Sequence, residues 1–199
     1  MIRILPLDMR KIVFDTETSN LFSDVGSPDP AALELSVVAI YDSASDSYQP
    51  FLQEDLAALW PILEQADLLI GFNSEHFDIP LLNKYYPGDL TKIRSLDILK
   101  EIKNSFGRRM KLDQLAEGTL GVNKSGKGID ATLWWREGQR EKVVDYCLDD
   151  VRITKAIYDY AIANKHLKFK EGGEVFTFPL DTSKWEISEE NNITHTLPF

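Results

Sequence analysis

The sequence is poor in the features that mark several large classes of proteins. It has a single cysteine, Cys147, among 199 residues, which excludes an internal disulfide framework and a zinc site built from several cysteines. It has no run of the roughly 18 apolar residues that a membrane helix needs, and its first residues lack the order of a signal peptide. We therefore expect a cytoplasmic protein that does not enter a membrane.

Positive charge is also scarce overall, but it is concentrated in one window. The net charge is −10, a poor first sign for a protein that binds nucleic acid. Between residues 92 and 142, however, there are twelve lysines and arginines and only seven acidic residues. This window therefore has a net charge of +5, and the rest of the chain has −15. This separation suits an acidic metal pocket beside a phosphate-binding surface, although solvated helix faces also produce charge runs.

Length and hydrophobic patterning indicate one α/β domain with a small addition. With 43% hydrophobic residues, the chain is long enough for one well-buried domain, which we place at residues 1–165, with a hairpin and tail at 166–199. Three strands come first and, through their short connections, predict an antiparallel meander; strands and helices then alternate. The predicted strands begin at Lys11 and cover 33–41, 48–52, 68–72 and 92–96, and the predicted helices cover 55–65, 97–106, 111–119 and 137–164.

The first strand carries two carboxylates where none is expected. Asp15 and Glu17 directly follow a β-branched and aromatic run that is typical of a central strand. Because side chains two apart on a strand point to the same side, two like charges would lie together and would favour a cation. Alternatively, the strand ends at Phe14 and Asp15 opens a turn, which is the more frequent meaning of an isolated D-x-E pattern.

A third acidic residue follows the fourth predicted strand. Asp78 fits the N-cap of a helix, because Pro80 stands in the first helical turn. The same position, after a parallel strand, is where ligands of open α/β sheets bind, so the carboxylate is also well placed to face a metal. We expect the neighbouring Glu75 and His76 to be solvent-facing turn residues.

The long predicted helix near the C-terminus supplies a fourth acidic residue. Tyr146 and Asp150 are four residues apart and therefore lie on one helix face, whereas Asp149 points elsewhere. An exposed helix carries acidic residues freely. This pair therefore indicates a site only in combination with the other acidic positions.

Together these residues resemble the three motifs of the DEDD superfamily of 3′→5′ exonucleases, which have a ribonuclease H-like fold. The resemblance covers Lys11 to about Ala163 and is carried by Asp15 and Glu17, by Asn73 with Phe77 and Asp78, and by Tyr146 with Asp150. Because Tyr146 precedes Asp150 by four, while Asp145 holds the place where the other branch has histidine, the chain resembles the tyrosine branch. Within that branch it is similar to stand-alone exonuclease-like domains related to the proofreading domains of family-B polymerases.

The resemblance implies a fold, a cofactor and a role for each site residue. It implies a central five-stranded mixed sheet flanked by helices, and two Mg²⁺ or Mn²⁺ ions, which prefer oxygen ligands. Asp15 would bridge both ions, Glu17 and Asp150 would complete the site of the ion that activates water, and Asp78 would hold the other, partly through water. Tyr146 would orient the attacking water.

The implied substrate is single-stranded nucleic acid with a 3′ end, DNA rather than RNA by preference; the oligomeric state is left open. The alternative is a nucleic-acid-binding or polymerase-accessory module with weak or no catalysis. Lys124 and Lys127 stand in a glycine-rich run without the Walker pattern. Leu21 or Phe22 would wedge against the terminal base, with ordinary loop packing as an equal alternative. The candidate substrate contacts are Thr16, Leu21, Phe22, Asn73, Phe77, Arg108, Arg109, Lys111, Lys124 and Lys127.

The last patterned segment predicts a β-hairpin around Gly172 and Gly173. Pairing across that turn places four apolar side chains on one face: Phe169 opposite Phe176, and Leu167 opposite Phe178. We expect the core to cover this face. The alternative is that the hairpin adds a strand to a partner protein.

Overall fold

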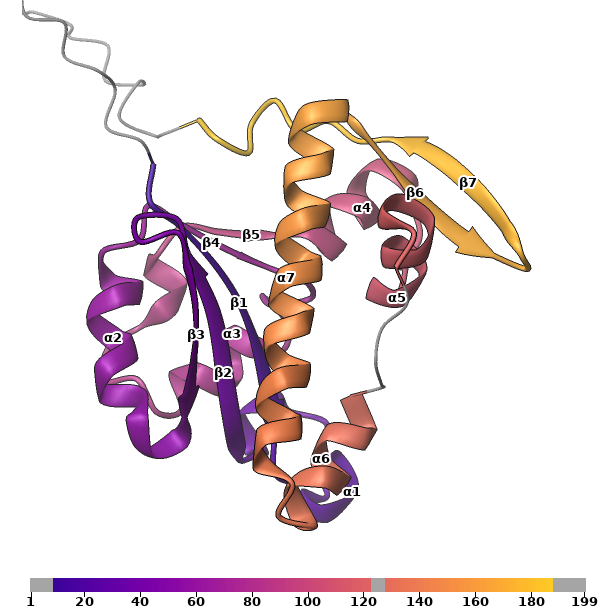
Figure 1. Ribbon diagram of the computed structural model, residues 1–199. Coiled ribbons are helices and arrows are strands. Elements are labelled where there is room, and N and C mark those ends of the chain that lie inside the picture. The colour runs from indigo at the N-terminus through magenta and orange to yellow at the C-terminus, as the bar shows by residue number, and fades with distance from the viewer. Residues whose placement is uncertain (1–8, 123–127, 188–199) are drawn as a thin grey trace, which may run out of the picture.

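The computed structural model describes residues 9–122 and 128–187 and has a five-stranded mixed sheet at its centre (Figure 1). The strand order is β3-β2-β1-β4-β5. The first three strands pair antiparallel, and β4 and β5 run parallel to β1, which confirms the predicted meander and mixed sheet. The strands are β1 (Lys11–Thr18), β2 (Leu35–Asp42), β3 (Ser47–Leu52), β4 (Leu68–Gly71) and β5 (Ser95–Asp97).

Helices cover both faces of the sheet (Figure 1). On one face lie α2 and α3, and on the other α4, α5 and α7; none of the described helices combines the length and the apolarity needed to cross a membrane. The helices are α1 (Phe22–Val25), α2 (Leu56–Glu64), α3 (Asp78–Asn83), α4 (Ile98–Phe106), α5 (Leu112–Leu115), α6 (Gly128–Arg136) and α7 (Arg140–Asn164). Within the described residues there are also four short helical turns: η1 (Pro30–Ala32), η2 (Gln53–Asp55), η3 (Leu90–Lys92) and the π-helical η4 (Ala116–Leu120).

Strand β1 lies in the middle of the sheet, and its alternating side chains pack into the hydrophobic clusters on both faces. Ile12 and Phe14 are buried against the α2 and α3 side, whereas Val13 is buried against α7. Pairing with β2 continues through Glu17 opposite Val37, so the strand does not end at Phe14, and the turn alternative for Asp15 is wrong. The two carboxylates therefore point to the same face as Val13.

Two of the elements begin three residues later than predicted. The fifth strand begins at Ser95 instead of residue 92, because the Asp89 carboxylate accepts the backbone N–H of Thr91 and stabilises η3 before the strand. The predicted helix at 137–164 is α7, which begins only at Arg140, because Gly138 adopts a positive φ of 77°. The preceding helix α6 was not predicted.

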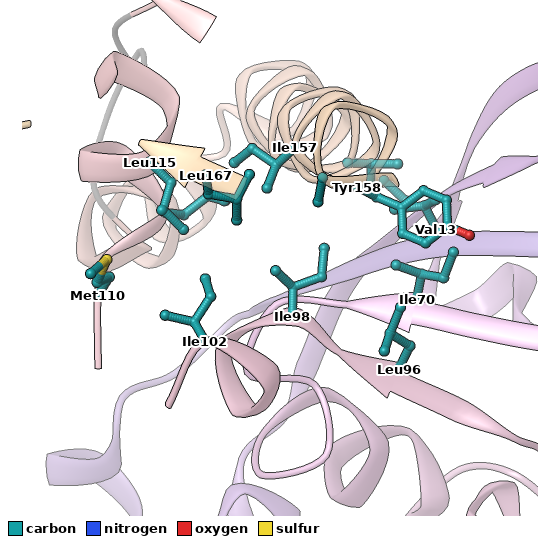
Figure 2. Close-up of a cluster of buried hydrophobic side chains, with 14 of the residues drawn as sticks. Val13, Ile70, Leu96, Ile98, Ile102, Met110, Leu115, Ile157, Tyr158 and Leu167 are labelled. Carbon is teal, nitrogen blue, oxygen red and sulfur yellow. The ribbon is translucent and has the colours of Figure 1, made fainter. Parts of the chain in front are cut away.

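The hairpin formed by β6 (His166–Glu171) and β7 (Glu174–Pro179) has the predicted register. Leu167, Phe169 and Phe178 are buried in the same cluster as α7, and Figure 2 shows Leu167 beside Leu115 and Ile157. Phe176, by contrast, is 42% exposed. The core thus covers three of the four apolar side chains, and the division between residues 165 and 166 stays a prediction.

If the hairpin is an integral part of the fold, the two phenylalanines of β7 should contribute very different amounts to the free energy of unfolding. Replacing buried Phe178 by alanine should lower the free energy of unfolding by about 3–5 kcal/mol, because a large cavity forms. The same change at exposed Phe176 should cost roughly 1 kcal/mol or less. Denaturant unfolding monitored by circular dichroism measures both; equal losses would contradict the arrangement.

Candidate active site

Three carboxylates from two distant segments meet where α7 crosses β1. One oxygen atom from each of Asp15, Glu17 and Asp150 lies within 4.8 Å of the others. The pleat of β1 presents the first two on one face, and α7 packs on that face and brings the third. Glu17 and Asp150 are buried, and Asp15 is half-buried. This convergence is the central feature of the site.

The electrostatics of the cluster favour a cation. Three carboxylates at this separation repel one another, and burial strengthens the repulsion, so the arrangement is unfavourable unless positive charge is bound. Carboxylate oxygens are the ligands that Mg²⁺ and Mn²⁺ prefer. The donor set therefore fits a divalent metal ion.

Asp78 lines the same pocket from the opposite side of β1. It is the first residue of α3 and is preceded by Phe77, so the prediction that it is the N-cap is wrong. Thr16, which shares the pleat face of Phe14, donates its hydroxyl to Asp78 Oδ1 at 2.6 Å. Burial raises the pKa of Asp78 to about 7, and the Thr16 hydroxyl acts in the opposite direction. Asp78 is thus a deeply buried carboxyl group beside the acidic cluster.

Tyr146 lies one helical turn before Asp150 and is buried in the pocket wall. Its ring makes an edge-to-face contact with Trp134 of α6, with ring centroids 5.8 Å apart. The next residue, Cys147, was missed by the sequence analysis. Its thiol donates to the Asp15 carbonyl oxygen at 3.4 Å and lies 3.6 Å from Asp15 Oδ2. Burial, with the adjacent carboxylates, raises the pKa of this thiol, so it stays protonated.

These groups surround a cavity of about 380 Å³. The predicted contacts Thr16, Leu21, Phe22, Asn73 and Phe77 all line it together with the four carboxylates and Tyr146. The sequence analysis missed the other lining residues: Thr18, Asn20, Leu33, Phe72, Leu112 and Thr132. Thr132 comes from the unpredicted helix α6, where its hydroxyl donates to the carbonyl oxygen of Thr18 at 3.1 Å.

A second hollow, of about 600 Å³, adjoins this cavity and shares Phe22, Asn73 and Phe77 with it. The rings of Phe22 and Phe77 meet edge to face, with centroids 6.2 Å apart, at the wall common to both spaces. His76, which is exposed as predicted, and Arg109 line the second hollow. Its chemistry is therefore aromatic and basic, in contrast to the acidic cavity.

A carboxylate outside the predicted set holds the loop between the two spaces. Asp97 at the end of β5 accepts the backbone N–H groups of Asn73 and Glu75 at 2.8 and 3.2 Å, and also caps α4. Asn73 adopts a φ of 66°, and its side-chain oxygen accepts a hydrogen bond from Arg109 at 2.7 Å. The only sequence signal for this role was an aspartate just before a helix.

The five basic candidates are distributed unequally. Arg109 reaches the rim of the site, whereas Arg108 turns to Glu171 of the hairpin, with Nη2 and Oε1 2.7 Å apart. Lys111 is exposed before α5 and does not line either space. Lys124 and Lys127 lie outside the described residues.

Comparisons with known proteins agree with this fold. No curated protein matches the sequence. The structure is similar to a family B DNA polymerase from the hyperthermophilic archaeon Pyrobaculum calidifontis, with a TM-score of 0.61 and 20% identity over 79% of this chain and 25% of that one. At that identity the likeness shows the fold, and the matched part is about a quarter of the polymerase. The sequence profile of the RNase H superfamily matches residues 12–162, which include every carboxylate of the site, and the chain belongs to that superfamily.

Proposed function

We propose that this protein is a metal-dependent 3′→5′ exonuclease that acts on the ends of single-stranded nucleic acid. The observation that carries the proposal is the convergence of Asp15, Glu17 and Asp150 within 4.8 Å, in a pocket that also contains Asp78 and Tyr146. The superfamily match and the motif resemblance support the same reaction. A module that only binds nucleic acid has no need to hold buried carboxylates that repel one another.

The proposal assigns a role to each residue of the site. Two Mg²⁺ or Mn²⁺ ions, when bound, would supply an activated water molecule and neutralise charge on the phosphate and the leaving oxygen. Asp15, Glu17 and Asp150 would hold the ion that activates the water, and Asp78, which lines the same pocket, would hold the second ion together with Asp15. The Tyr146 hydroxyl would orient the water, and the Trp134 contact restrains its ring.

The shape of the site supports action at a chain end. The 380 Å³ cavity falls within the usual range of small-ligand pockets and lies behind the Phe22 and Phe77 pair. An aromatic pair in that position would separate the terminal base from the next one. The second hollow, with Arg109, would then receive the next nucleotide.

The acidic cluster predicts dependence on a divalent metal. Mg²⁺ or Mn²⁺ should raise the melting temperature by linkage, by an amount worth about 2.7 kcal/mol at a hundredfold excess over Kd, and excess chelator should abolish hydrolysis. Asp150→Asn should neither be stabilised by the metal nor hydrolyse the substrate. Asp149→Asn, one residue away on an exposed face and paired with Arg152, is the control. Undiminished hydrolysis in chelator would exclude the mechanism.

Asp78 should be destabilising to the metal-free protein. Its folded pKa lies above the value of an exposed aspartate, so the unfolded chain ionises first and stability falls as pH rises toward about 7. Asp78→Asn keeps an oxygen that accepts from Thr16, and should raise the melting temperature in chelator at about pH 8. The same variant should gain less than wild type from added metal, as thermal melts with and without Mn²⁺ would show.

Tyr146 is expected to affect rate and not metal binding. Tyr146→Phe keeps the ring and its contact with Trp134 but removes the hydroxyl, so the rate should fall by ~10² or more while metal affinity changes little. Tyr160→Phe, on the same helix but with its hydroxyl beside His166, is the matched control. Single-turnover rates and Mn²⁺ titrations test the separation; a wild-type rate for Tyr146→Phe would mean the tyrosine has another role.

Polarity is the fourth consequence of this site. A pocket that takes a terminal nucleotide needs a free end, so linear single strands with a 3′-hydroxyl should be shortened stepwise to 5′-mononucleotides. Circular single strands should stay intact, and 3′-phosphorylated ends should react slowly. Gel analysis of labelled DNA and RNA distinguishes these outcomes and shows which is preferred. Rapid cutting of circles would indicate an endonuclease instead.

A further inference from the structure

A cluster of aromatic side chains lies outside the site, where the C-terminal end of α4 meets the hairpin. The ring of Phe106 lies 4.8 Å from that of Phe178 and 5.9 Å from that of Phe169, which stacks on Phe176 at 5.2 Å. Figure 1 shows the hairpin standing out from the body of the molecule beside α4 and α5. We call Phe106, Phe169, Phe176 and Phe178 the hairpin aromatic cluster.

Two of the four rings in this cluster are partly exposed to solvent. Phe169 and Phe178 are 3% and 1% exposed and anchor the hairpin, but Phe106 and Phe176 remain 39% and 42% exposed. Adjoining exposed aromatic side chains of this kind usually mark a binding surface. The hairpin also lies beyond residue 162, where the superfamily match ends.

A guanidinium group stands over the cluster. Arg108 lies 5.3 Å from the Phe169 ring centre and donates two hydrogen bonds to Glu171, at 3.1 and 2.7 Å. Both partners are nearly half exposed, so solvent and salt screen this ion pair and a competing anion can replace Glu171. Arginine beside exposed aromatic rings is the composition of surfaces that bind single-stranded nucleic acid.

The cluster is continuous with the candidate active site through one residue. Arg108 is followed directly by Arg109, which lines the hollow next to the acidic cavity and donates to Asn73. Gly107, with a φ of 79°, ends α4 and starts this turn. Two consecutive arginines therefore point to two neighbouring sites, one at the rim of the pocket and one at the hairpin.

We propose that the hairpin aromatic cluster is a platform for single-stranded nucleic acid that extends from the pocket. The strand passes Arg109 and then Arg108, which contact its phosphates, and its bases stack on the exposed rings of Phe106 and Phe176. The path of the strand rests on the proposed function, because it starts from a 3′ end in the pocket. Binding to the platform itself does not require hydrolysis.

The experiment measures binding in chelator, where no hydrolysis interferes. A labelled single-stranded DNA of about 15 nucleotides is long enough to cover pocket and platform, and one of about 3 nucleotides covers the pocket alone. Changing both Phe106 and Phe176 to leucine should weaken binding of the long strand about 10-fold or more. Each stacked base contributes roughly a 5- to 100-fold factor to the affinity. The short strand should bind as it does to wild type.

Matched variants separate stacking from general apolarity. Changing both residues to tyrosine keeps the rings and should retain affinity, whereas leucine keeps apolar area but cannot stack. Ile187→Ala, at a position 50% exposed and outside the cluster, should have no effect. Because the two rings are exposed, melting temperatures of all variants should stay near that of wild type. Leucine variants that bind the long strand as wild type does would overturn the proposal and leave the surface to a protein partner.

The ion pair gives a test in the opposite direction. Glu171→Gln removes a charge that competes for Arg108 and repels phosphate, so the long strand should bind more tightly, while Arg108→Ala should weaken binding and lower its salt dependence. The short strand again should not respond. If the protein proves unable to hydrolyse nucleic acid, these binding results still decide the platform; if it hydrolyses but none of these variants changes long-strand affinity, the platform is wrong and the nuclease assignment stands.

Discussion

Repulsion among carboxylates at the crossing of β1 and α7 is the constraint that the rest of the structure has to satisfy. Asp15, Glu17 and Asp150 are held within 4.8 Å of one another, an arrangement that costs free energy until a cation binds. Apolar packing supplies the opposing force. Val13 and Ile70 pack against α7 around Tyr158, and Ile98 and Ile157 extend the same cluster (Figure 2). The helix cannot move away from the strand without exposing this core.

The pleat of β1 divides the chemistry of the site between the two faces of the sheet. Asp15 and Glu17 face α7, whereas Thr16 faces α3 and binds Asp78. Strand β1 thus carries two of the carboxylates on one face and binds a third, Asp78, on the other. The loop after β4 closes the remaining side, where Asp97 accepts its backbone N–H groups and Arg109 binds Asn73.

The hairpin aromatic cluster adds a surface that extends beyond the region that matches the superfamily. The superfamily match ends at residue 162, and the hairpin that follows is anchored by buried Phe178 while it leaves Phe176 exposed. If the pocket takes only a chain end, as proposed, it contributes little affinity for a long strand. An adjoining stacking surface would supply that affinity without sequence preference, because every base has a face that can stack.

Much of the site was predictable because its signals are local. A period of two placed Asp15 and Glu17 on one face, a period of 3.6 placed Tyr146 one turn from Asp150, and the Gly172-Gly173 turn set the hairpin register. Each of these depends on neighbours only a few residues away. The antiparallel pairing of the first three strands was predicted from their connections in the same way.

Other features depended on contacts between segments far apart in the chain. Arg108 and Arg109 are adjacent and chemically alike, yet one binds Glu171 and the other Asn73, which lie 63 and 36 residues away. Helix α6 had no clear pattern, although it brings Thr132 to the pocket and Trp134 to Tyr146. The sequence pattern around Asp78 indicated a helix cap, but it could not show that Thr16 of β1 would be the hydrogen-bond partner of this carboxyl group. Periodicity determines which way a side chain points from its own element, but only the packing of elements determines what it meets there.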